Sequence, residues 1–201
     1  MQFISYVLHP LLMPTLVFTV IFYFLPESVK PIDNEAIPFL LLAILITTFI
    51  IPVLSISALR FTSTISSLSL QKREERVVPF IFIGMFYALT TYLFIHRIQV
   101  NEVIALMMIT TSVLIGLLTA ITLKYKISIH AAGICGSAGY LIALANTYQS
   151  EALIYPATAA IVLSGVVMTA RLYLNAHTLN EVAAGCFLGF GICFSSVYFL
   201  A

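Results

Sequence analysis

Two histidines, a carboxylate and several cations stand at points in the sequence where long apolar stretches begin or end. His177 and Glu181 are four residues apart, so they share one face of a helix that begins near His177. A carboxylate in that position holds an imidazole in one tautomer and stabilises the charge that develops when the imidazole acts as a nucleophile. Arg171 lies just upstream, and its planar guanidinium can donate two parallel hydrogen bonds to a phosphate. The spacing therefore predicts nucleophilic chemistry at a phosphoryl group.

A second polar cluster stands where another apolar stretch is expected to begin a helix. It contains Lys126, Ser128 and His130. Free backbone N–H groups at the start of a helix favour an anion, and the lysine and the serine add donors. A phosphate ester that is attacked by one histidine needs a second group to protonate the departing alkoxide and then to activate water. His130 is the candidate for that acid and base.

A third cluster is the run from Lys72 to Pro79, in which Lys72 and Arg76 add positive charge. Taken singly, such residues are typical of ordinary membrane proteins, because cations near helix ends often extend to the interface or contact lipid headgroups. Taken together, two histidines, a carboxylate and at least three cations are costly near membrane depth and indicate a function. His9 has no charged residue near it in the sequence, and we interpret it as structural or interfacial.

The composition indicates that membrane helices must position these clusters. With 61% hydrophobic and 8% charged residues, the chain lacks the charged surface of a soluble domain and is too apolar for a disordered one. Its net charge of +1 gives no reason to expect nucleic acid as a partner. The three cysteines lie in apolar stretches and form no CxxC pair, so we expect neither a disulfide framework nor a zinc site.

Seven stretches approach the roughly 20 apolar residues that cross a bilayer core of about 30 Å. They are residues 4–25, 36–59, 77–95, 103–123, 131–147, 152–173 and 179–200. Because only a helix or a closed barrel satisfies its own backbone in lipid, and no alternating polar face is present, the sequence predicts an all-α integral membrane protein, a bundle of six to seven transmembrane helices. We expect a single transmembrane domain, 1–201, with the motif-bearing core at about 60–201.

Two of these stretches have distinctive features. The first lacks the basic start and small-residue cleavage site of a signal peptide, so we expect it to remain as a helix, kinked or started by Pro10 and Pro14. The stretch 131–147 is short and rich in glycine and serine, which let membrane helices approach closely. We therefore expect it to lie inside the bundle rather than against lipid.

If all seven stretches span, the three clusters lie on one side of the membrane, because two spans separate each cluster from the next. That side carries seven of the nine Lys and Arg residues, namely Arg60, Lys72, Arg73, Arg76, Lys124, Lys126 and Arg171. The positive-inside rule would place it in the cytoplasm. Four of the seven are candidate phosphate ligands, however, and without them the count is three against two, so the side that the site faces stays open. We expect a multi-pass protein of a cell inner or plasma membrane.

At these residues the chain resembles the type 2 phosphatidic acid phosphatase (PAP2) superfamily, whose pattern is K-x6-R-P, then P-S-G-H, then S-R-x5-H-x3-D. The third element is matched by Arg171, His177 and Glu181, with Ala170 in place of the serine and glutamate in place of the aspartate. The second element keeps its serine and histidine as Ser128 and His130. The first keeps Lys72 and a following proline, while Arg76 lies three residues before that proline.

The resemblance implies a metal-independent phosphatase that needs no cofactor. His177 would be the nucleophile that forms a phosphohistidine, Glu181 would orient it, and His130 would be the acid and then the base. Lys72, Arg76, Ser128 and Arg171 would hold the phosphate, and Lys126 is an extra candidate from its position alone. The family is usually described with six spans, one fewer than the seven stretches here.

Embedding in a lipid bilayer favours a lipid phosphate as the substrate. A polyprenyl diphosphate, phosphatidate and phosphatidylglycerol phosphate all fit the sequence. One alternative is a catalytically inactive PAP2-like protein that binds or transports a phospholipid. Another is an intramembrane serine protease that uses Ser128 or Ser137 with a histidine, which would leave the cations without a role.

Overall fold

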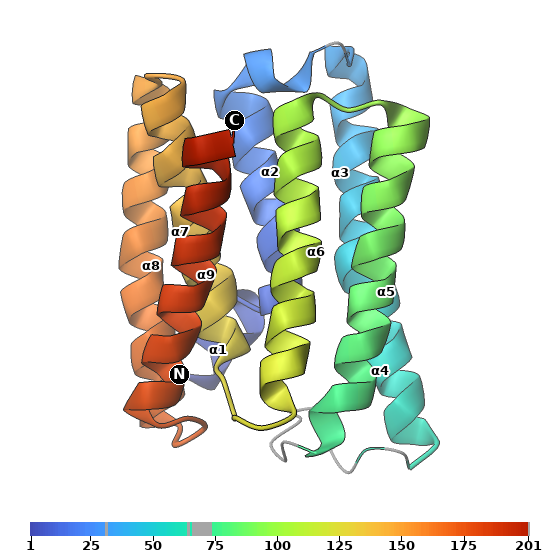
Figure 1. Cartoon of the computed structure of the whole chain (residues 1–201), viewed down its shortest axis with the longest axis vertical. Helices are drawn as coiled ribbons and strands as arrows, with labels where there is room; N and C mark the ends of the chain where they lie inside the picture. Colours follow the sequence, from blue (N-terminus) through green and yellow to red (C-terminus); the bar gives the residue numbers. More distant parts are fainter. Residues whose placement is uncertain (31, 64, 66–73, 201) are drawn as a thin grey trace.

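The computed structural model of the chain describes residues 1–30, 32–63, 65 and 74–200, and the regular structure within these ranges is entirely helical (Figure 1). Among the described residues, seven helices are long and apolar enough to cross a membrane. They are Gln2–Phe24, Asn34–Phe61, Val77–Ile98, Glu102–Thr122, Ile129–Thr147, Glu151–Tyr173 and Leu179–Leu200. The predicted helical membrane bundle is therefore confirmed, with seven candidate spans.

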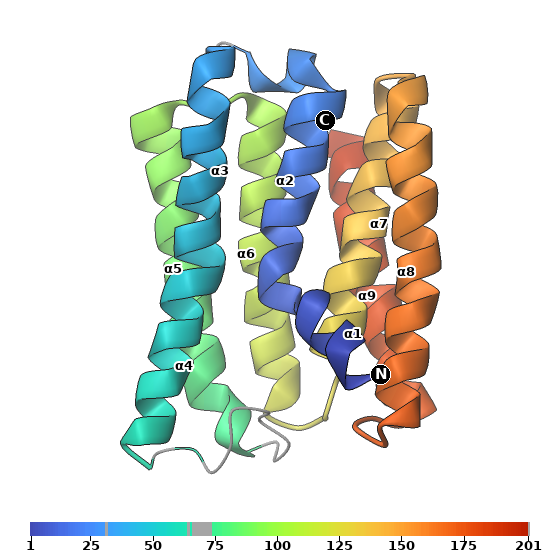
Figure 2. The same ribbon diagram turned by 180° about the vertical axis from the view of Figure 1, so that it is seen from behind.

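The first span is broken near its start. The short helix α1 (Gln2–Val7) is followed by a 3-10 turn (Pro10–Leu12) and then by α2 (Met13–Phe24). Between them His9 has an extended backbone (φ −67°, ψ 136°), as expected for a residue before proline. Its ring Nδ1 accepts a hydrogen bond from the Leu11 N–H, which caps the turn. The bend places α1 against α8 (Ile154–Tyr173) rather than in line with α2 (Figure 2).

The next two spans each contain a short π-helical segment. In the second span α3 (Ile37–Leu45) continues through a π segment (Ile46–Ile50) into α4 (Ile51–Phe61). In the third, α5 (Val77–Leu93) ends in another (Phe94–Ile98), after which Gln99 adopts a left-handed conformation with φ 58°. The chain then returns through α6 (Glu102–Thr122), which packs against α5.

The helix α7 (Ile129–Thr147) lies inside the bundle, between α8 and α9 (Leu179–Leu200). In an 18-residue apolar stretch of this helix 67% of the residues are buried, whereas in the other six spans the corresponding share is 39% or less. This confirms the interior position expected for this stretch. Gly185 and Gly189 of α9 face α7 so closely that a Cβ at either position would overlap a backbone carbonyl, of Ser128 and Ala132 respectively. Small residues of α9 thus bring two helix backbones into direct contact.

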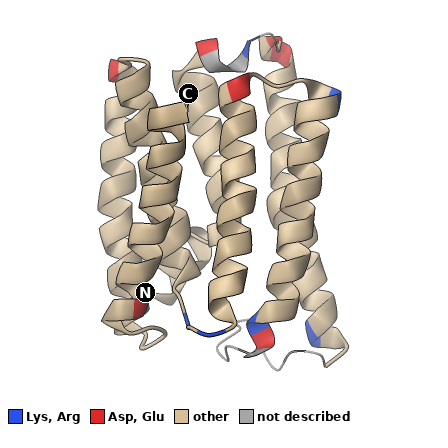
Figure 3. Cartoon of the chain, viewed as in Figure 1, with Lys and Arg blue, Asp and Glu red and all other residues tan. Residues whose placement is uncertain are grey.

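The charged residues that the structure describes gather at the two ends of the bundle (Figure 3). The end of α4, the start of α5, the end of α6, the start of α7, the end of α8 and the start of α9 lie at one end (Figures 1 and 2). That end carries the second and third polar clusters and the Arg76 part of the first. We call it the cationic end.

Candidate active site

His177 and Glu181 form the best-defined pair at the cationic end. His177 Nδ1 lies 2.7 Å from Glu181 Oε2, and the two side chains are 3% and 15% exposed. Because a carboxylate only accepts, Nδ1 carries the proton and the Nε2 lone pair is left for chemistry. The predicted pair is therefore in direct contact, although α9 begins at Leu179 and His177 lies just before the helix instead of on its face.

Glu181 is itself held by the first turn of α9. Its Oε2 accepts the Thr178 N–H at 3.3 Å, and the Glu181 N–H donates to Thr178 Oγ1 at 3.4 Å. This reciprocal arrangement is a capping box, with the threonine at the N-cap and the glutamate three residues later. One carboxylate thus caps the helix and orients the imidazole, so the imidazole is fixed by the backbone itself.

The surroundings of His177 favour its neutral form. Burial lowers the pKa of His177 to about 4, and the nearby Arg76 and Arg171 guanidinium groups act in the same direction, while the hydrogen bond to Glu181 opposes them. A neutral imidazole at pH 7 has a free lone pair, as a nucleophile requires.

Arg76 stands just before α5 and is only 5% exposed. Its Nη1 donates to the Ile127 carbonyl at 3.3 Å, which ties it to the connection before α7. Burial lowers the pKa of Arg76, as does the positive charge of Arg171, whereas Glu181 raises it. Two guanidinium groups therefore lie near one another at the buried edge of the site, an arrangement that an anion between them would stabilise.

Arg171 comes from the last turn of α8. Its Nη1 donates to Ser5 Oγ at 3.4 Å, while its buried Nε has no hydrogen-bond partner among the described residues. A buried donor of a charged group that lacks a partner costs free energy. A bound anion would accept a hydrogen bond from it and remove this cost.

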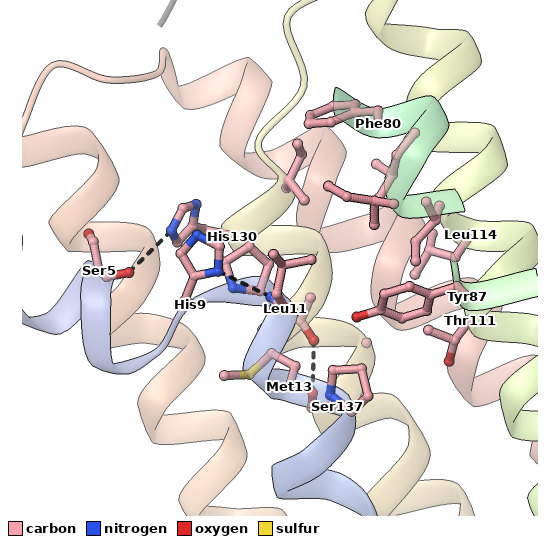
Figure 4. Close-up of a pocket in the computed structure, with 18 of the residues that line it drawn as sticks. Ser5, His9, Leu11, Met13, Phe80, Tyr87, Thr111, Leu114, His130 and Ser137 are labelled. Atoms are coloured by element: carbon pink, nitrogen blue, oxygen red, sulfur yellow. Dashed lines mark hydrogen bonds between the residues drawn. The ribbon is translucent and has the colours of Figure 1, made fainter. Parts of the chain in front are cut away.

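His130 lies in the first turn of α7 and reaches the N-terminal segment. Its Nε2 lies 3.3 Å from the Ser5 carbonyl oxygen, so Nε2 is the donor and Nδ1 is left to accept. The His9 ring lies 5.5 Å from the His130 ring, in an edge-on arrangement (Figure 4). Ser5 thus contacts both His130 and Arg171, which are 41 residues apart in the sequence.

These residues line a single cavity of about 450 Å³. Arg76, His130, Arg171 and His177 all contribute to its wall, together with Ser5 and His9. Neither Ser5 nor His9 was predicted from the sequence as a site residue. A histidine inside an apolar span was the only signal that could have found His9, and for Ser5 the sequence contains none.

Three further predicted site residues, Ser128, Lys126 and Glu181, are not among the residues that line the cavity. Ser128 is fully buried, and its Oγ accepts the Ala131 N–H at 3.4 Å as the N-cap of α7. Lys126 lies on the partly exposed connection before it. Glu181 is bonded to the lining residue His177 but does not itself line the cavity. Lys72 lies outside the described residues.

The lining side chains are of the types that favour an anion. Among the described residues there is no group of three or more His, Cys, Asp or Glu side chains that could hold a metal ion. The cavity instead brings two guanidinium groups together with three imidazoles. Fold and site together define the class: a multi-pass helical membrane protein with a cationic, histidine-containing cavity at one end.

Comparison of the chain with known protein families, with characterised proteins and with solved structures finds no match.

Proposed function

We propose that this chain is a metal-independent phosphatase that hydrolyses a lipid phosphate or diphosphate through a phosphohistidine intermediate at the membrane interface. The observation that carries the proposal is the bond of 2.7 Å between His177 and Glu181, in a cavity wall that also contains Arg76 and Arg171. The resemblance to the PAP2 superfamily at Arg171, His177 and Glu181 supports the same assignment.

In the first step the Nε2 lone pair of His177 attacks phosphorus, and the bond between phosphorus and the alkoxide oxygen breaks. Arg76 and Arg171 hold the phosphoryl oxygens, whose negative charge they stabilise in the transition state. Glu181 stabilises the positive charge that develops on the His177 ring. His130 in its protonated form gives a proton to the leaving oxygen.

In the second step water replaces the histidine. His130, now neutral, takes a proton from the water, whose oxygen attacks the phosphohistidine as the N–P bond breaks. Inorganic phosphate leaves, His177 regains its lone pair, and His130 is protonated again. A diphosphate substrate follows the same route, with a phosphate monoester as the leaving group.

A second candidate function is binding or transport of a phospholipid without catalysis. It is favoured by the contacts of the N-terminal segment, since Ser5 occupies both the Nε2 of His130 and an Nη1 of Arg171. A protease is less well supported, because Ser137 donates to the Gly133 carbonyl at 2.8 Å and Ser128 caps α7. We place the protein in a cell inner or plasma membrane.

The test is phosphate release by purified protein from a panel of lipid phosphates: a polyprenyl diphosphate, phosphatidate and phosphatidylglycerol phosphate. We expect release that resists EDTA, is inhibited by vanadate and is abolished in His177→Ala. Binding of these lipids with no release by the wild type would favour the second candidate. Loss of activity in EDTA with recovery in magnesium would contradict the metal-independent mechanism.

A further inference from the structure

The cavity continues from the cationic end into the apolar middle of the bundle. On α5 and the turn before it, the lining residues Arg76, Phe80, Ile83 and Tyr87 follow one helix face. Eleven residues separate the first from the last, which at 1.5 Å per residue is a depth of roughly 16 Å. The cavity therefore reaches about half-way through a bilayer core of about 30 Å.

Two further helices give the same depth independently. On α6, which ends at the cationic end, the lining runs inward from Leu118 through Leu114 and Thr111 to Met107. On α7, which starts there, it runs from His130 to Tyr140. The described part of the cavity is thus a chamber with charged groups at one end and apolar side chains along its length.

The inner end of the chamber has hydroxyl groups that are already paired. Tyr140 OH donates to the Met107 carbonyl at 3.0 Å and lies 3.0 Å from Thr111 Oγ1. Tyr87 OH donates to the Thr48 carbonyl at 3.3 Å. Because these groups have partners within the protein, the inner end does not require a polar ligand and can contact hydrocarbon.

The chamber is elongated. Its volume of about 450 Å³ extends over a depth of roughly 16 Å, with the arginine side chains of its lining at one end, and this shape suits an extended hydrocarbon chain that carries a phosphate at one end. We propose that the chamber takes up the chain of a single-chain lipid phosphate, alkyl or prenyl, so that the chain lies inside the bundle while the phosphate lies between Arg76, Arg171 and His177. The position given to the phosphate in this proposal rests on the proposed function.

The chamber would select its ligand by shape. A chain that leaves lipid for an apolar cavity gains little, because lipid is as apolar as the cavity wall. A short chain dissolved in water does gain, by about fourfold in affinity for each methylene group buried. Chain-length dependence measured with water-soluble ligands therefore reports on the chamber.

The experiment measures binding of alkylphosphonates of increasing chain length to the detergent-solubilised protein by calorimetry, after subtraction of a protein-free micelle blank. Phosphonates are not hydrolysed, so the result does not depend on catalysis. We expect affinity to rise with chain length and then to level off when the chamber is full. Dihexanoyl phosphatidate, which has two chains, should compete poorly. Affinity that does not change with chain length, or equal competition by the two-chain lipid, would overturn the inference.

Substitutions that place a larger side chain in the chamber test whether the hydrocarbon chain binds there. Thr111→Phe should shorten the chain at which affinity levels off, and should weaken dodecylphosphonate by about 16-fold or more if at least two methylene contacts are lost. Val113→Phe is the control, because Val113 lies on the same helix at similar depth but is 51% exposed on the outer surface. Ser137→Leu fills the chamber from α7 if Thr111→Phe is unstable. Unchanged chain-length profiles in both folded variants would show that the chain binds elsewhere.

The outcomes separate this inference from the proposed function. Chain-length-dependent binding without phosphate release would support chain binding in the chamber and contradict the proposed phosphatase activity. Phosphate release by the wild type with identical profiles in Thr111→Phe and Val113→Phe would retain the phosphatase and refute the chamber. A prenyl phosphonate compared with an alkyl phosphonate of equal length identifies the preferred chain chemistry.

Discussion

The Nδ1 of His177 and the Oε2 of Glu181 lie 2.7 Å apart, and the same Oε2 accepts the Thr178 N–H at the start of α9. Removal of a nucleophile should reduce turnover more than removal of the group that orients it. We expect His177→Ala to reduce turnover to background, because the proposed covalent intermediate forms on the ring of His177. Glu181→Gln should leave activity above background but reduce kcat by up to about 10⁴-fold, because an amide no longer fixes the tautomer of the imidazole.

Rapid quenching with a radiolabelled substrate provides the direct readout for this pair. The wild type should show an acid-labile, base-stable phosphoenzyme, and the His177 variant should show none. Glu181→Asp is the conservative control, since it keeps a carboxylate with a shorter reach, and it should retain measurable activity. Near wild-type turnover in His177→Ala would rule out the phosphohistidine mechanism.

The titration of His177 follows from its surroundings. Burial lowers its pKa to about 4 from the ordinary value of 6.5, whereas the bond to Glu181 raises it. In the folded protein the ring should therefore stay neutral to well below pH 6, and Glu181→Gln should move the midpoint still lower. The folded state binds this proton less readily than the unfolded chain, so stability should fall as the pH drops from 6.5 towards 4.

NMR of the histidine side chains measures this midpoint without a substrate. The chain has four histidines, so a spectrum of histidine-labelled protein is simple, and the His177→Ala variant assigns the signal. A midpoint near 6.5 would show that the ring is solvated, and it would remove the argument that His177 is held neutral.

Close packing of α7 on α9 positions His130 relative to His177, and it gives a stability prediction with an internal control. A Cβ at Gly189 would overlap the Ala132 carbonyl, whereas Gly191 has no neighbouring atom within 4 Å of the same position. Gly189→Ala should destabilise the protein by about 1–3 kcal/mol through overpacking. Gly191→Ala should be neutral or stabilising by up to about 1 kcal/mol, because alanine is the better helix former. Thermal unfolding in detergent compares the two, and equal melting temperatures would contradict the close approach.

Much of the fold was readable from the sequence because membrane spans depend on local composition. The seven stretches match seven helices to within a few residues at each end, and the glycine-rich stretch 131–147 is the most buried. The contact between His177 and Glu181 could also be predicted from their spacing of four residues, although His177 lies just before α9 and not on its face. Such features depend on short-range spacing alone.

The rest of the site depends on contacts between distant parts of the chain. Ser5 meets His130 and Arg171 across 125 and 166 residues, and it does so because the chain bends at His9 and Pro10. The sequence predicted a kink there but not its direction. Ser128 shows that residue type alone can also mislead. Its hydroxyl was predicted to contact a phosphate, but its Oγ accepts a hydrogen bond from the Ala131 N–H and caps α7.

The sidedness of the clusters is testable by labelling. Tyr125 and Asn175 are exposed on connections at the cationic end, and Tyr148 is exposed at the other end of α7. Single cysteines at these positions, with Cys135, Cys186 and Cys193 replaced, should react with an impermeant maleimide in sealed vesicles of one orientation. Positions 125 and 175 should label from the same face and position 148 from the opposite face. Labelling of 125 and 175 from opposite faces would mean that α7 or α8 does not span.

The last prediction concerns His130 and the leaving group. If His130 protonates the departing alkoxide, its removal should slow an alkyl phosphate by about 10²–10⁴-fold, the usual contribution of a positioned proton donor. A nitrophenyl phosphate needs no such proton, because nitrophenolate is stable as an anion, so phosphorylation of His177 by this substrate should be affected much less by His130→Ala. Breakdown of the phosphohistidine still needs a base to activate water, so the variant should release a burst of nitrophenolate and then turn over slowly. His9→Ala is the matched control, since the His9 ring lies beside His130 but is given no proton to transfer. Equal losses for both substrates in the burst phase would show that His130 positions the phosphate or the N-terminal segment instead of donating a proton.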